Sequence, residues 1–197
     1  KFASCVSDLL RYGVKLIGGC CGTTPEYIAE IKKMLADKSC QPQKKSVDTT
    51  VCSASAVVEI NGPRIIGERI NPTGKKLFKQ ALVDNNIDYI LTQAMTQVNG
   101  GAEILDVNVG HPEIDEKKMM VRVIKAIQSV CDVPLQIDST KPDVLEAGLR
   151  CYNGKPIVNS VNGEEESLST VLPLVKKYGA SVVGLTLDEN GIPKTAE

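Results

Sequence analysis

From residue 57 onward, short apolar runs alternate with stretches whose apolar residues recur at helical spacing. The apolar runs predict strands at residues 64–68, 104–109, 135–138, 157–159 and 181–187. The apolar stripes between them predict helices around residues 87–98, 120–127, 145–152 and 168–175. Nearly continuous apolar strands separated by helices indicate a parallel sheet covered by helices. The sequence therefore predicts an α/β fold.

The ends of the predicted strands carry polar side chains. They are Glu68, Asp106, Asn108, Asp138 and Asn159. A polar group within a buried strand costs free energy unless it finds a partner. In a parallel sheet these ends surround one crevice or barrel mouth, so one shared ligand explains all five. Carboxylates and amides suit a neutral heterocycle that is rich in N–H donors and ring acceptors.

Helix capping is the alternative interpretation of Asp106, Asp138 and Asn159. For Asp138 the following Thr140 or Lys141 is better placed to cap. Neither G-x-G-x-x-G nor G-x-x-x-x-G-K-[ST] occurs, so a dinucleotide site and a Walker-type phosphate site lack support. We therefore favour ligand contact for Asp138 and Asn159 and leave both interpretations open for Asp106 and Glu68.

Three segments are expected along the chain. Residues 1–37 read as a helix, a short buried strand at 14–18 and a second helix that begins after Thr23 or Thr24. Residues 38–56 are polar and lack helical periodicity, which indicates an interdomain linker. Residues 57–197 hold the strand–helix alternation.

Cys20 and Cys21 lie where the strand predicted at 14–18 meets the next helix, in the motif GGCCGTTP of residues 18–25. Active sites of α/β barrels are built at this edge, and soft thiolates suit zinc. The alternative is a pair of small buried residues in a glycine turn. The seven cysteines of the chain are odd in number and scattered, which favours reduced thiols in the cytoplasm over disulfides.

Charge and hydropathy exclude some partners. The net charge of −1 gives no electrostatic case for binding nucleic acid or an anionic membrane. No apolar stretch approaches the roughly 18 residues that span a bilayer.

Two groups of motifs resemble one family. The motif of residues 18–25 looks like the end of the homocysteine-binding barrel of cobalamin-dependent methionine synthase. The series from GERINPTG at residues 67–74 to NSVNG at residues 159–163 resembles the pterin-binding barrel that follows it. The resemblance implies a (β/α)₈ TIM-barrel type fold, with the last βα unit of one barrel and an incomplete second barrel. We expect a curved parallel sheet with an open side, or pairing with another chain.

The resemblance also implies a reaction. It is methyl transfer from 5-methyltetrahydrofolate via cobalamin to homocysteine, which gives methionine and tetrahydrofolate. Asp138 and Asn159 match the family's pterin contacts, and Glu68, Asp106 and Asn108 lie beside them as supporting contacts.

Cofactors and partners follow from the same resemblance. Cys20 and Cys21 match two of three zinc ligands, and the third lies upstream of Lys1, so we expect weak or no zinc binding here. Cobalamin is implied, with a cobalamin-binding module of the parent protein or a separate corrinoid protein as partner.

Two other functions stay open. One is a pterin-binding methyltransferase that passes the methyl group to a different corrinoid protein, although the linked Cys20-Cys21 motif argues against it. The other is a non-catalytic α/β binding module, which the missing barrel strands favour.

Overall fold

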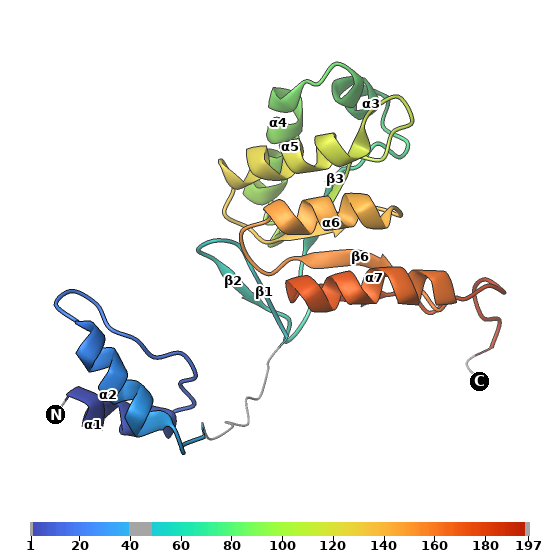
Figure 1. Cartoon of the computed structure of the whole chain (residues 1–197). Helices are drawn as coiled ribbons and strands as arrows, with labels where there is room; N and C mark the ends of the chain where they lie inside the picture. Colours follow the sequence, from blue (N-terminus) through green and yellow to red (C-terminus); the bar gives the residue numbers. More distant parts are fainter. Residues whose placement is uncertain (1, 40–48, 196–197) are drawn as a thin grey trace. The chain divides into compact units, whose positions relative to one another are not determined.

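The computed structural model describes residues 2–39 and 49–195 (Figure 1). The chain divides into two compact units, Lys1–Val47 and Asp48–Glu197. The boundary between them falls inside the segment 38–56, and residues 40–48 of that segment lie outside the described residues. No helix in the described part of the chain is long and apolar enough to cross a membrane.

The first unit contains two helices, α1 (Phe2–Leu10) and α2 (Pro25–Leu35). Val6 of α1 and Ile31 of α2 are the buried apolar residues of this unit's described part. Both helices match the predicted helical segments.

The strand predicted at residues 14–18 is not formed. These residues have no strand pairing, and the side chain of Leu16 is 92% exposed. A strand is stable only when a neighbouring strand takes up its backbone hydrogen bonds, and no described segment pairs with this one. The prediction of a buried strand is therefore wrong, and Cys20 and Cys21 lie in an exposed loop between α1 and α2.

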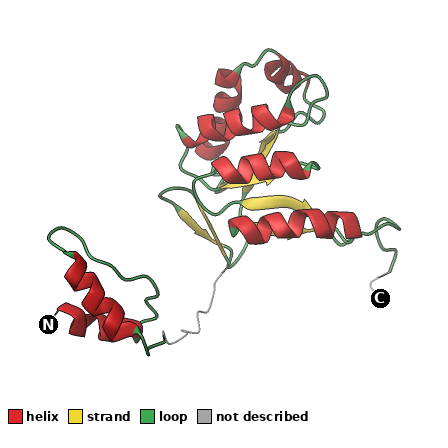
Figure 2. Ribbon diagram, in the orientation of Figure 1, coloured by secondary structure: helices red, strands yellow, loops and turns green. Residues whose placement is uncertain are grey.

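The second unit is built on a parallel sheet of five strands (Figure 2). The strands follow one another in chain order across the sheet, and each pairs in parallel with the next. They are β3 (Ile66–Ile70), β4 (Ile104–Asn108), β5 (Leu135–Asp138), β6 (Ile157–Val161) and β7 (Ser181–Gly184). Each of the five predicted strands overlaps one of them.

Helices pack against one face of this sheet. They are α4 (Ile87–Asn99), α5 (Glu116–Gln128), α6 (Pro142–Cys151) and α7 (Glu165–Tyr178), while α3 (Lys76–Val83) packs against α4. Their apolar stripes and the strand residues that face them form one core, as the alternation predicted. The sequence analysis missed α3, which buries Phe78 and Leu82 in the same core. Pro173 lies inside α7 without ending it.

A small antiparallel hairpin precedes the sheet, formed by β1 (Thr50–Cys52) and β2 (Val57–Glu59). Residues 50–52 were expected in a linker, so this part of the expectation is corrected. The hairpin is held by distant residues, because Tyr152 Oη donates to the carbonyl oxygen of Cys52 at 2.8 Å. Asp132 Oδ2 likewise accepts from Ser55 Oγ at 2.6 Å. No local sequence pattern reveals such contacts.

On the sheet face away from the helices, the side chains change from apolar to polar along the strands. Ile104 and Ile157 are buried together with Val51 of the hairpin and form an apolar floor. Two residues further along β4, Asp106 lies in register with Gln136 of β5, and both are buried. Strand side chains alternate between faces, so Asp106 points to the same side as Ile104. The next layer holds the candidate site.

The outer strands of the sheet are β3 and β7. Each pairs with a single neighbour among the described strands. A closed barrel has no such edges, so the second unit is an open part of a barrel, as expected.

Candidate functional site

Three polar residues lie side by side at the carboxyl ends of neighbouring strands. Asn108 of β4 is in register with Asp138 of β5, which is in register with Asn159 of β6. The shared register places the three side chains on one face of the sheet. The sequence predicted this convergence because parallel strands end at the same edge.

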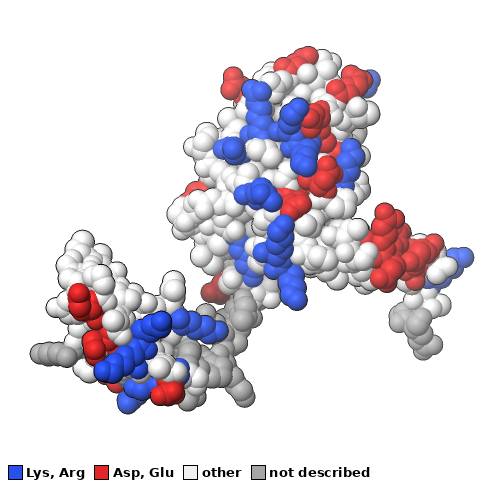
Figure 3. Space-filling model, viewed as in Figure 1, with Lys and Arg blue, Asp and Glu red and all other residues white. Residues whose placement is uncertain are grey.

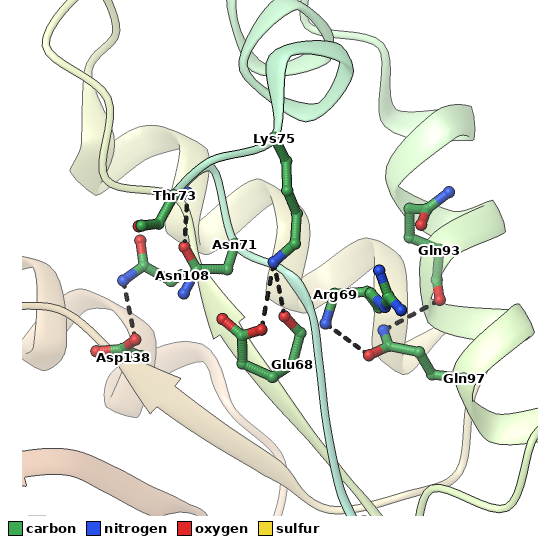
Figure 4. A network of polar contacts seen from close by, with 9 residues as sticks. All are labelled: Glu68, Arg69, Asn71, Thr73, Lys75, Gln93, Gln97, Asn108 and Asp138. Atoms are coloured by element: carbon green, nitrogen blue, oxygen red, sulfur yellow. Dashed lines mark hydrogen bonds and ion pairs between the residues drawn. The ribbon is translucent and has the colours of Figure 1, made fainter.

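The amide of Asn108 is oriented by two contacts. Its Oδ1 accepts from the backbone N–H of Gly110 at 2.8 Å, which directs Nδ2 toward Asp138. Nδ2 then donates to Asp138 Oδ2 at 2.9 Å (Figure 4). No described residue donates a hydrogen bond to the other oxygen of Asp138, so this oxygen is available to a ligand.

Asp106 lies one layer below these three residues. Its side chain is buried, and its Oδ1 accepts from Gln136 Nε2 at 2.6 Å and from Asn159 Nδ2 at 3.4 Å. Burial raises the pKa of Asp106 to about 6, and the charges of Asp138 and Glu68 add to that effect. The hydrogen bond from Gln136 opposes it. Asp106 is thus a carboxyl group that gains or loses a proton near neutral pH.

Gln136 adds an unusual feature to this layer. Its Oε1 is fully buried and has no hydrogen-bond partner among the described residues. A buried acceptor without a donor is costly, so a water molecule or a ligand donor at this place would lower the free energy. The sequence analysis did not single out Gln136, because a glutamine in an apolar run gives no sign of its partner.

Glu68 of β3 is exposed and pairs with a cation from its own loop. Lys75 Nζ lies 3.3 Å from Glu68 Oε2 and donates to the Glu68 carbonyl oxygen at 3.0 Å (Figure 4). The Glu68 charge still reaches the neighbouring strands, because it raises the pKa of Asp106 and of Asp138. Glu68 therefore lies at the same carboxyl-terminal edge of the sheet as Asp138, but its carboxylate is paired with Lys75.

Burial raises the pKa of Asp138 above its ordinary value. The hydrogen bond from Asn108 lowers it, while the charges of Glu68 and Glu116 raise it further. These carboxylates repel one another, so a ligand that donates hydrogen bonds is favoured over an anion.

A cavity of about 460 Å³ opens beside Asp138 and Asn159. It runs from these two residues past Asn162 to the apolar side chains of Leu185 and Leu187. This volume lies within the range of small-molecule sites. The cavity combines hydrogen-bonding groups at one end with apolar surface at the other. Acidic side chains also gather near the amino-terminal end of α7 and the segment after β7 on the face shown in Figure 3.

Cys20 and Cys21 form a separate candidate site in the first unit. Their sulfur atoms are 3.8 Å apart, both side chains are exposed, and neither forms a disulfide. Two sulfurs bound to one tetrahedral zinc at about 2.3 Å each lie about 3.8 Å apart. The spacing of Cys20 and Cys21 therefore suits two of the four ligand positions of a single zinc ion. No group of three or more histidine, cysteine or acidic side chains within the described residues is arranged to hold a metal ion.

Two family comparisons match successive parts of the chain. Residues 67–197 match the family described as pterin binding enzyme, and residues 1–35 match the family described as homocysteine S-methyltransferase. The two matches occur in the order that the sequence motifs indicated.

Curated relatives give the same result along almost the whole chain. Methionine synthase of Mycobacterium tuberculosis (strain ATCC 25618 / H37Rv) is 32% identical over 96% of this chain and 16% of its own length. Methionine synthase of Mycobacterium leprae (strain TN) is 34% identical over 96% of this chain and 17% of its own length. The chain thus spans about a sixth of these relatives.

Solved structures confirm the fold. Dihydropteroate synthase from Thermus thermophilus matches with a TM-score of 0.51 and 24% identity, over 71% of this chain and 49% of that one. The Yersinia pestis enzyme, solved with a pterine-sulfa conjugate, matches with a TM-score of 0.53 and 19% identity, over 76% and 52%. At these identities the likeness concerns the fold alone, which is the predicted TIM-barrel type.

Proposed function

This chain belongs to the pterin binding enzyme family, and from that premise we propose that its second unit binds 5-methyltetrahydrofolate for methyl transfer. The observation that carries the proposal is the row of Asn108, Asp138 and Asn159 above the buried Asp106. The methionine synthase relatives support the methyl-transfer reaction.

We propose that the pterin ring is recognised by the free oxygen of Asp138 and the amide of Asn159. A carboxylate oxygen accepts from the N–H groups of an amino-pyrimidine edge, and an asparagine amide both donates and accepts. Because Asn108 holds one oxygen of Asp138, the other is fixed in place before the ligand arrives. Fixing the geometry in advance lowers the entropy that binding costs.

Asp106 is our candidate for handling a proton. Loss of the methyl group requires N5 of the pterin to leave as a neutral amine, and this step calls for a general acid. With a pKa of about 6, part of the Asp106 population is still protonated near neutral pH and can donate that proton as a general acid. Asn159 contacts Asp106 and also lines the cavity, so it links the buried carboxyl to the ligand space.

The methyl acceptor that we propose is cobalamin, on a cobalamin-binding module of a longer protein or on a separate corrinoid protein. Final transfer to homocysteine would give methionine and tetrahydrofolate. The match of residues 1–35 to the homocysteine S-methyltransferase family supports homocysteine as the final acceptor. It favours this route over transfer of the methyl group to a different corrinoid protein. Residues 1–37 and the second unit would then derive from two consecutive barrels. A cytoplasmic location is part of the same proposal.

We propose that Cys20 and Cys21 hold zinc together with a third ligand upstream of Lys1. Zinc at this place would bind the homocysteine sulfur and keep it as a thiolate at neutral pH. The spacing of the two sulfurs supports the assignment, as does the motif in which they lie.

The ligand test is calorimetric titration of the 197-residue chain with 5-methyltetrahydrofolate. Asp138→Ala is expected to weaken binding about 10-fold to 100-fold, because hydrogen bonds to a charged group contribute about 1.5–3 kcal/mol. Asp143→Ala serves as the control, since Asp143 lies on α6 and pairs only loosely with Lys117 at 3.9 Å. Equal affinity of Asp138→Ala and the unchanged chain would refute the role of Asp138.

The zinc test is a metal count on the same chain. We expect well below one zinc per chain after dialysis, because two thiolates are one ligand short of the usual catalytic set of three. A double change, Cys20→Ser with Cys21→Ser, should remove the zinc that remains, while Cys5→Ser in α1 should leave it. A full equivalent of zinc that survives dialysis would contradict the prediction of weak binding.

A further inference from the structure

Glu116 is a buried carboxylate that nothing in the proposed reaction has yet used. It is the first residue of α5 and is only 8% exposed. An acidic residue in the first turn of a helix is favoured by the helix dipole, but an exposed one serves that purpose equally well. Burying a carboxylate costs free energy unless both oxygens find partners. Those partners show what Glu116 does.

Both carboxylate oxygens of Glu116 reach the loop after β5. Oε1 accepts from Ser139 Oγ at 2.6 Å, and Oε2 lies 2.8 Å from Lys141 Nζ. Ser139 Oγ in turn accepts from the backbone N–H of Lys141 at 3.2 Å. Residues 139–141 are therefore held by a side chain from the neighbouring βα unit. Ser139 directly follows Asp138 in the chain.

The two βα units are thus joined twice at the mouth. The first link is the hydrogen bond from Asn108 to Asp138 described above. The second is the contact of Glu116 with residues 139–141. The loop is fixed on its other side as well, because the backbone N–H of Ser139 donates to the carbonyl oxygen of Asn159 at 3.2 Å. Asp138 lies between these attachments.

We propose that Glu116 is a positioning residue, whose carboxylate holds residues 139–141 and thereby sets the place of Asp138 for the pterin ring. This inference rests on the proposed function. Without Glu116, Ser139 loses its acceptor and Lys141 its counterion. The peptide on the carboxyl side of Asp138 is then free to move, and a small misplacement of a recognition group weakens binding markedly.

The test compares Glu116→Ala, Glu116→Gln and Ser139→Ala with the unchanged chain. We expect Glu116→Ala to weaken binding of 5-methyltetrahydrofolate about tenfold and Ser139→Ala to weaken it by a similar factor. The double variant should lose little more than either single one, because both changes break the same link. Glu116→Gln should be intermediate, since its amide oxygen still accepts from Ser139 while the attraction to Lys141 is lost. A loss of about tenfold corresponds to the contribution of one hydrogen bond.

Amide hydrogen exchange without ligand provides a second readout. In Glu116→Ala we expect faster exchange at Ser139 and Lys141, with α5 unchanged. The control is Glu146→Ala, which removes a comparable pair on the outer surface, the 2.7 Å contact of Glu146 with Lys177. It should leave both the affinity and the exchange at residues 139–141 unchanged.

The outcomes separate the two proposals. Unchanged exchange at residues 139–141 in Glu116→Ala would overturn the positioning role, as would faster exchange with unchanged affinity. If the unchanged chain does not bind 5-methyltetrahydrofolate, or if Asp138→Ala binds equally well, the proposed function fails. The exchange data would then still show whether Glu116 holds the loop.

Discussion

Asp106→Asn is expected to raise the free energy of unfolding by about 3 kcal/mol at pH 8 and to change it little at pH 4. The raised pKa of Asp106, about 6 against an ordinary 3.8, means that the native state binds its proton more tightly than the unfolded state. Stability from this group is therefore fully present below about pH 4 and is lost as pH rises through 6. Two pKa units correspond to about 3 kcal/mol.

The asparagine also suits the site chemically. Its Oδ1 can still accept from Gln136 Nε2, as Asp106 does at 2.6 Å. Its new N–H group can donate to Gln136 Oε1, which is buried and unpaired among the described residues. The variant would thus form a reciprocal amide pair without a buried charge. We expect the affinity for 5-methyltetrahydrofolate to fall at the same time, because a buried charge that lowers stability is commonly kept for its function.

Urea unfolding at pH 4 and pH 8 measures the effect. Asp132→Asn is the control with the opposite sign, because hydrogen bonds from Ser55 and Ser53 lower the pKa of the exposed Asp132. That variant should lose a little stability at pH 8. A stability gain for Asp106→Asn that is equal at both pH values would show that the charge of Asp106 is not its cause.

Gly154→Ala is expected to lower the free energy of unfolding by about 3 kcal/mol. Gly154 has a φ of +148°, and a Cβ built there would lie 2.3 Å from the carbonyl oxygen of Cys52. That atom is backbone in the hairpin strand β1, so it cannot rotate away. Backbone strain and overpacking each cost about 1–3 kcal/mol. In the Gly154→Ala variant, either the hairpin moves away from the sheet or the backbone at residue 154 remains strained.

Gly101→Ala separates the two causes. Gly101 has a φ of +96°, but nothing lies within 4 Å of a Cβ there. It should cost only about 1 kcal/mol for the unfavourable backbone conformation. The measurement is urea unfolding of both variants, with amide exchange in β1 to detect displacement of the hairpin. Equal losses in the two variants would show that the approach of Gly154 to Cys52 does not matter.

The sheet was predictable from the sequence because its signals are local. Apolar runs such as residues 135–138 are bounded by turns, and the helices between them carry their own stripes. Parallel pairing then follows from the alternation itself. The meeting of Asn108 with Asp138 was predictable for the same reason, since strand ends share one edge.

The remaining features depend on partners far away in the sequence. The hairpin at residues 50–59 is held by Tyr152 and Asp132, and no pattern in its own sequence shows this. The strand predicted at residues 14–18 has the right composition but no neighbouring strand among the described segments. Glu116 reads as a surface acid at a helix start, although tertiary packing buries it.

The floor formed by Val51, Ile104 and Ile157 has a kinetic consequence. Methylated and demethylated folate share the pterin ring, so both would bind in the same place above this floor and exclude each other. If the second unit works as we propose, tetrahydrofolate should act as a competitive inhibitor toward its methylated form, and turnover should slow as the demethylated compound accumulates.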